Sequence, residues 1–105
     1  MRFVETRVFT QAVTGLLNDE EYSTLQRALI LRPDLGAVIP GGGGIRKVRW
    51  RAAGRGKRSG LRVIYFWQVS PERFFMLYAY SKSEAGDLTQ TQLRFLRSLI
   101  VESLT

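Results

Sequence analysis

The sequence predicts an α+β fold in which two N-terminal helices and one C-terminal helix pack on a small antiparallel meander sheet. Three observations favour it. Apolar residues recur at helical spacing as far as Leu29 and again from Leu93, whereas between Ile45 and Tyr80 they alternate with polar residues or run continuously. Pro40 and the four glycines at 41–44 separate the two patterns. Short turn signals, rather than helices, join the extended stretches.

The first elements are a strand at Arg2–Glu5 and a helix for which Thr6 is the predicted N-cap and Gly15 the weak end. One face of this helix is apolar: Phe9, Val13 and Leu16. Asn18, with Glu21 three residues later, predicts a capping box that opens a second helix. This helix should stop near Arg32, because Pro33 disfavours helical geometry in the residue before it.

Three strands follow the glycines, at Ile45–Arg51, Leu61–Val69 and Arg73–Tyr80. A basic loop at 54–60 and a tight turn at 70–72 connect them, so consecutive strands should pair antiparallel. The chain then finishes with a helix from about Thr89, where Gln92 completes another capping box. We expect the helices to lie against one side of the sheet.

Length and composition indicate one domain over residues 1–105, with 45% hydrophobic residues to fill its core. The chain has no His and no Cys, which excludes disulfides, the usual zinc sites and an imidazole base, and we expect no cofactor. No signal peptide or membrane-spanning segment is evident, so a soluble cytoplasmic protein is expected, without a membrane partner.

Positive charge is concentrated in one segment. The formal net charge is +7, and eight of the sixteen Lys and Arg residues lie between Arg46 and Arg62, with no Asp or Glu between Asp34 and Glu72. On a strand, Lys47, Arg49 and Arg51 share one face. A solvated outer face is the ordinary explanation of such alternation. However, like charges side by side destabilise a sheet, so a polyanion-binding surface accounts better for the cluster.

Other motifs give weaker signals. The glycines near Lys57 lack the spacing of a phosphate-binding loop, and those at 41–44 lack the strand-to-helix context of a dinucleotide site, so both indicate turns. The many aromatic residues of the second and third long strands are mostly expected in the core. Tyr80, one step before the polar end of its strand, is the candidate for an accessible ring that stacks on RNA bases.

Three segments together resemble the RelE/HigB superfamily of bacterial toxins, and the order of elements is similar over nearly the whole chain. These segments are residues 43–50 (GGIRKVRW), 56–65 (GKRSGLRVIY) and 78–82 (YAYSK). The Gly-Gly-x-Arg-Lys-x-Arg-Trp pattern is most similar to the HigB-type branch. The resemblance implies a type II toxin that cleaves mRNA in the ribosomal A site, and a cognate antitoxin of the helix-turn-helix type.

Carried over to this chain, the resemblance implies catalytic roles for Lys47, Arg49, Arg62 and Lys82. The familiar C-terminal tyrosine of some members has no match, because the corresponding residues are Asp87-Leu88-Thr89. For a cleavage by the 2'-hydroxyl, we expect Lys47 to act as base, because crowding by like charges favours its neutral amine. Arg49 and Arg62 would clamp the phosphate, and Lys82 would stabilise the phosphate or the leaving group, although other assignments within the set remain open.

The remaining cations form an expected rRNA-binding fringe: Arg51, Arg55, Lys57 and Arg58. A basic module that holds RNA or the ribosome without cutting it has the same composition, because binding and catalysis of this kind use the same side chains. The two hypotheses differ in geometry. A catalyst needs its cations around one phosphate-sized point, whereas a binding module spreads them along a groove.

Overall fold

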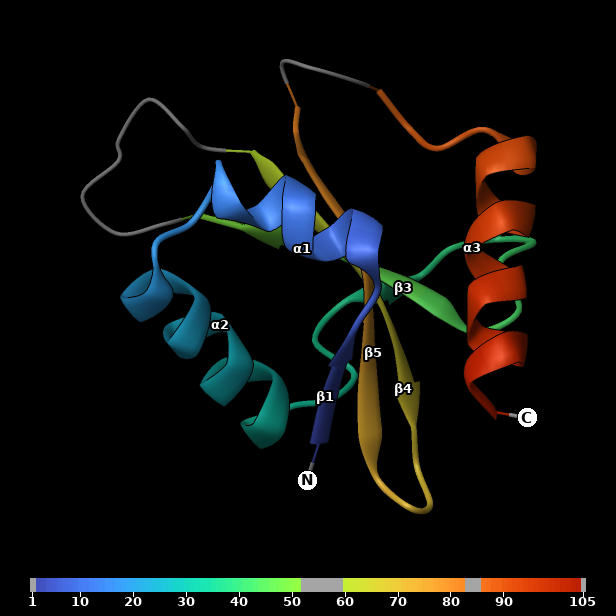
Figure 1. Ribbon diagram of the computed structural model, residues 1–105, viewed down its shortest axis with the longest axis horizontal. Coiled ribbons are helices and arrows are strands. Elements are labelled where there is room, and N and C mark those ends of the chain that lie inside the picture. Colours follow the sequence, from blue (N-terminus) through green and yellow to red (C-terminus); the bar gives the residue numbers. More distant parts are fainter. Residues whose placement is uncertain (1, 52–59, 83–85, 105) are drawn as a thin grey trace.

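A five-stranded sheet with the strand order β1-β5-β4-β3-β2 organises the protein. The computed structural model describes residues 2–51, 60–82 and 86–104 (Figure 1). Its strands are β1 (Arg2–Glu5), β2 (Ala37–Val38), β3 (Ile45–Trp50), β4 (Leu61–Gln68) and β5 (Arg73–Ser81). The antiparallel pairing of β3 with β4 and of β4 with β5 confirms the predicted meander.

The two outer strands differ from the prediction. β2 was not expected: it is only two residues long, too short for an alternating pattern, and pairs antiparallel with Arg46 and Lys47 of β3. β1 pairs with β5 in parallel, so the sheet is mostly rather than wholly antiparallel. A parallel partner is reached because the chain between β1 and β5 passes through the helices and the rest of the sheet.

The three helices begin where their capping residues predict. They are α1 (Arg7–Thr14), α2 (Asp19–Leu31) and α3 (Gln90–Leu104). The Thr6 hydroxyl accepts a hydrogen bond from the Phe9 amide (2.9 Å), and Asn18 and Glu21 form the reciprocal capping box of α2. At α3 the Thr89 amide donates to the Gln92 side chain (2.8 Å) and the Gln92 amide donates to the Thr89 hydroxyl (3.1 Å). Each pair satisfies amides that a helix leaves open at its start.

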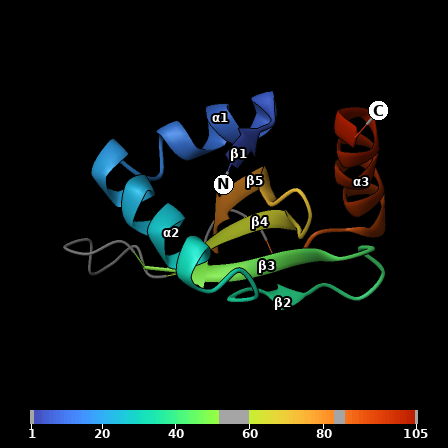
Figure 2. The same cartoon turned by 90° about the horizontal axis from the view of Figure 1, so that it is seen from below.

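The helices cover both faces of the sheet, so the expectation that they share one side was wrong. On one face, α1 and α2 form a core with alternate strand residues, including Val63, Tyr65 and Phe74. On the other, Leu96 and Ile100 of α3 pack with the intervening strand residues. Figure 2 shows α2 and α3 on opposite sides of the strands. The central strands are apolar on both faces for this reason. No helix among the described residues has the length and apolar character to cross a bilayer.

A register shift in β5 changes which side chains face α3. Ile64 of β4 pairs with Tyr78, but the next residue, Tyr65, pairs with Met76, so Leu77 is an extra residue on β5. Such a bulge reverses the alternation of the strand beyond it. Phe75 and Leu77 therefore belong to the core under α3, and so do Tyr78 and Tyr80.

The loop at 41–44 is a turn, as interpreted from the sequence, and it also contacts α3. Gly43 has a φ of 66°, and a Cβ atom at this position would lie 2.6 Å from Nε of Arg97. Only glycine lets the Arg97 side chain approach the backbone so closely. The contact joins this loop to α3.

Candidate functional site

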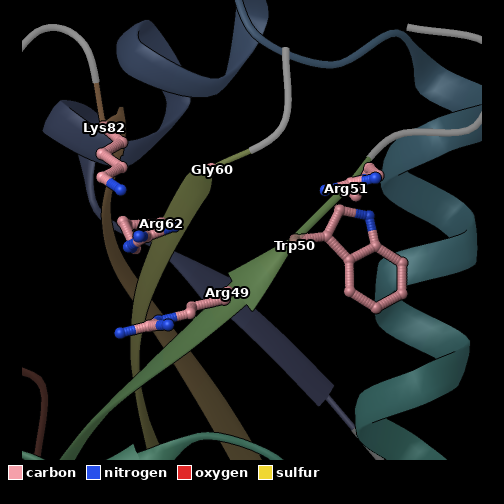
Figure 3. Close-up of a pocket in the computed structure, with 6 residues that line it drawn as sticks. All are labelled: Arg49, Trp50, Arg51, Gly60, Arg62 and Lys82. Carbon is pink, nitrogen blue, oxygen red and sulfur yellow. The ribbon is translucent and has the colours of Figure 1, made fainter. Parts of the chain in front are cut away.

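Four predicted cations lie on the α3 face of the sheet, at the end toward which β3 and β4 leave the described structure. Lys47 and Arg49 are two residues apart on β3, and Arg49 pairs directly with Arg62 of β4. The Lys82 amide donates to the Gly60 carbonyl (2.8 Å), which continues the same register beyond β5. Figure 3 shows Arg49, Arg62 and Lys82 projecting to one side, while the Trp50 indole projects away toward a helix. The sheet thus gathers cations from three neighbouring strand segments.

Three of these cations, Arg49, Arg62 and Lys82, line a shallow hollow of about 370 Å³, and Lys47 does not line it. Its lining residues are Arg49, Trp50, Arg51, Gly60, Arg62 and Lys82. Four of the six are cationic, and in the part of the chain that the structure describes no carboxylate lines the hollow. Gly60 has a φ of 100°, and a Cβ atom there would approach the Lys82 side chain to 3.0 Å. Glycine therefore allows Lys82 to lie close to the start of β4.

Arg62 is the unusual member of the cluster, because it is buried. Only 9% of its surface is exposed, and no hydrogen bond or ion pair joins its guanidinium to any other described residue. Its guanidinium is open to the hollow, since the described residues include no fully buried side-chain nitrogen that lacks a hydrogen-bond partner. The position is therefore suited to an anion that comes from outside the protein.

Lys47 has a partner that sequence analysis missed. Its ammonium lies 2.9 Å from a carboxylate oxygen of Asp87, 40 residues later, in the segment before α3. The hydrogen bond and charge of Lys47, with smaller contributions from Arg49 and Arg62, hold the pKa of Asp87 below its usual value of 3.8. The ion pair means that Lys47 is not the free side chain that the sequence predicted.

Tyr80 is not the accessible ring that the sequence predicted. Only 4% of the residue is exposed, because the bulge turns it under α3, where its ring stacks on that of Tyr78 at 5.8 Å between centroids. Burial raises the pKa of its hydroxyl above 10.0, and the positive charge of Lys47 opposes this rise only in part. Tyr80 pairs with Arg62 across the strands. Its place is beneath the cations, and base stacking on its face is excluded.

The remaining predicted fringe is only partly described. Arg51 is exposed and lines the hollow at the end of β3. Arg55, Lys57 and Arg58 lie outside the described residues. Among the residues that are described, no three acidic side chains come together in a group that could hold a metal ion. The chemistry available at the hollow is therefore that of guanidinium, ammonium and one nearby carboxylate.

Comparison with known protein families gives a clear match. A family model described as the RelE toxin of the RelE/RelB toxin-antitoxin system matches residues 1–104. The match spans every strand and helix described above and all the cations around the hollow.

Proposed function

We propose that this chain, which belongs to the RelE toxin family, is a ribosome-dependent endoribonuclease that cleaves mRNA and stops translation. The observation that carries this proposal is the cluster of Arg49, Arg62 and Lys82 around one hollow, with Arg62 buried and unpaired among the described residues. A cluster around one point supports catalysis over simple binding. We also propose that the chain acts in the cytoplasm and belongs to the HigB-type branch, on the strength of its GGIRKVRW segment.

The proposed reaction needs no external nucleophile. The ribose 2'-oxygen attacks the adjacent phosphorus, its proton passes to a base, and the bond from phosphorus to the 5'-oxygen breaks. The products are a 2',3'-cyclic phosphate and a 5'-hydroxyl, which receives a proton. Negative charge grows on the phosphoryl oxygens in the transition state, and fixed cations that meet it there lower the barrier.

Arg62 and Arg49 are the proposed phosphate clamps. A guanidinium presents a planar, permanently charged fork that matches two phosphoryl oxygens, and Arg62, which pairs with no described residue, gains a partner when the phosphate arrives. Lys82, on the far side of the hollow, is the proposed stabiliser of the leaving oxygen. These roles agree with the side-by-side arrangement of the three side chains (Figure 3).

The base has two candidates, because Lys47 and Asp87 form a pair. A lysine base must lose its proton first, so cleavage through Lys47 rises with pH across the neutral range. The Asp87 carboxylate is already ionised there, since its pKa lies below 3.8, so cleavage through Asp87 is flat from pH 6 to 8. Single-turnover rates of wild type, Lys47→Ala and Asp87→Asn across that range decide between them.

The main test is mRNA cleavage on programmed ribosomes, followed by primer extension. Arg62→Ala and Lys47→Ala should each lower the single-turnover rate by about 10²–10³-fold. Arg27→Ala is the matched control, because Arg27 is an exposed arginine on α2, in the helical layer on the other face. If both site variants cleave at the wild-type rate, the proposed active site is wrong.

The alternative is a basic module that binds RNA or the ribosome and leaves it intact. The exposure of Arg49 and Arg51 at the hollow is compatible with it. Under this hypothesis, wild-type protein sediments with ribosomes but yields no cut message. Under either hypothesis each exposed cation that contacts a phosphate should add about 0.7–0.9 to the slope of log K against log salt.

The family implies a cognate antitoxin. We propose that it is a helix-turn-helix protein encoded beside this chain. Expression of the chain alone should arrest growth, and co-expression of the neighbouring reading frame should relieve that arrest. Continued growth arrest with the neighbour present would argue against that partner.

A further inference from the structure

We infer that a groove between α1 and α3 is the docking site for an acidic, apolar segment of the cognate antitoxin. The inference rests on the proposed function for the identity of the partner, and adds where it binds and by what chemistry. The groove has a volume of about 480 Å³, and Val8 of α1, Tyr78 of β5 and Phe95 of α3 are among its lining residues. In Figure 1 the first turn of α1 lies nearer to α3 than the last turn does.

The groove is apolar, and the described residues leave it uncovered. Phe95 is 54% exposed, although a ring of this size is normally buried or in contact with a partner. Its neighbour Leu96 is only 4% exposed and Leu88 is half-buried, so the groove has an apolar base beneath an exposed aromatic wall. One bulky apolar side chain from a partner would fill this space.

The charge of the groove's rim indicates which residues of the partner should lie beside its apolar side chain. No Asp or Glu occurs in α1 or between Gln90 and Val101 of α3, whereas both helices carry arginines. The Arg94 guanidinium lies 3.5 Å from the hydroxyl of Thr91, which itself lines the groove. The nearest acidic residue before α1, Glu5, already accepts hydrogen bonds from Thr10 and Tyr22. Carboxylates on the partner would complement this rim.

The groove also adjoins the cations of the candidate active site. Tyr78 lines the groove and stacks on Tyr80, which pairs with Arg62. Leu88, on the groove's other side, directly follows Asp87. The charged side chains beside this part of the groove are therefore Arg62 and the ion pair of Asp87 with Lys47, a set with net positive charge that again favours an acidic partner. A second copy of this protein fits poorly, because each copy carries a net charge of +7.

The test measures binding of the protein encoded by the neighbouring reading frame, by calorimetry at two salt concentrations. Phe95→Ser should weaken binding at least about tenfold, as loss of a buried aromatic anchor does, and Phe95→Leu should restore part of it. Arg94→Glu should weaken binding most at low salt. Val101→Ser and Arg27→Glu are the controls. Val101 is 59% exposed on α3 and does not line the groove, and Arg27 lies 3.5 Å from Thr24 on α2, the same local contact that Arg94 makes.

Equal affinity of wild type and Phe95→Ser would overturn the inference. So would an equal loss in the Val101→Ser control, absence of binding by the wild type, or a wild-type dimer in sedimentation that Phe95→Ser abolishes. Thermal unfolding of each variant checks that folding is intact. The same preparations are assayed for mRNA cleavage without the partner, where Phe95→Ser should match wild type. If the wild type cleaves no mRNA but binds the partner in a way that Phe95→Ser weakens, the proposed nuclease activity is refuted and the docking site is supported.

Discussion

Replacing Arg62 by Met should make the protein more stable and less active. The substitution keeps most of the volume of the side chain and removes a charge that is 9% exposed and lies directly opposite Arg49 in the sheet. Like charges at such opposed positions cost about 0.2–1 kcal/mol, and a charged side chain with so little exposed surface also loses part of its hydration. We therefore expect the free energy of unfolding to rise by about 1 kcal/mol.

Chemical and thermal unfolding measure this change. For a domain of this size, 1 kcal/mol corresponds to a rise in Tm of about 4–8 °C. The part of the gain that comes from repulsion should shrink in high salt, because the Debye length falls from about 10 Å at 0.1 M to about 3 Å at 1 M. Arg27→Met, at an exposed position on α2, should change Tm little.

Ribosome-dependent cleavage by the same variant should fall by about 10²–10³-fold. Opposite signs for stability and activity would show that Arg62 is retained for the reaction and not for the fold. A loss of stability of about 1 kcal/mol or more in Arg62→Met would refute the reasoning, because it would mean that the guanidinium stabilises the folded state.

Three further predictions concern single features of the structure. Asp87→Asn should leave Tm nearly unchanged and should raise RNA affinity, because the substitution frees the positive charge of Lys47. In the wild type, the Asp87 carboxyl should titrate by NMR with a midpoint below pH 3.8. Tyrosines whose pKa is raised by full or partial burial bind protons more tightly when folded, so their stabilising effect is complete below pH 10 and is lost as the pH rises further. Absorbance at 295 nm should show them ionising together with alkaline unfolding. They are Tyr22, Tyr65 and Tyr80. Gly43→Ala should cost about 1–2 kcal/mol in urea unfolding because of its positive φ and the contact with Arg97, whereas Gly15→Ala, with φ of −86° and open space around it, should be neutral or stabilising.

Local signals in the sequence predicted most of the fold. Helix starts at Thr6, Asn18 and Thr89 were predictable because each cap is formed by residues within three positions of one another. The side of the sheet that α3 covers was not predictable. β4 is apolar on both faces, so its pattern is compatible with a layer of helices on either face. β2 gave no signal at all, since two residues have no period.

The candidate site, too, was predictable where it depends on local sequence and not where it depends on contacts between distant segments. Lys47, Arg49 and Arg62 were brought together by strand alternation and simple antiparallel pairing, which the sequence contains. The pairing of Lys47 with Asp87 joins positions 40 apart through the placement of α3, and no local pattern encodes it. The only available hint was that Asp87 is the acidic residue nearest the start of the last helix.

The extra residue in β5 has a consequence for how this protein can vary. Leu77 and Tyr78 are consecutive and both belong to the core under α3, whereas Met76 before them and Ala79 after them belong to the core on the other face. In a variant that lacks Leu77, Tyr78 would follow Met76 in regular alternation and keep its pairing with Ile64, so Tyr80 would stay opposite Arg62 and Lys82 beside Gly60. A single deletion at this position would thus remove one buried leucine from beneath α3 without taking any cation out of the cluster.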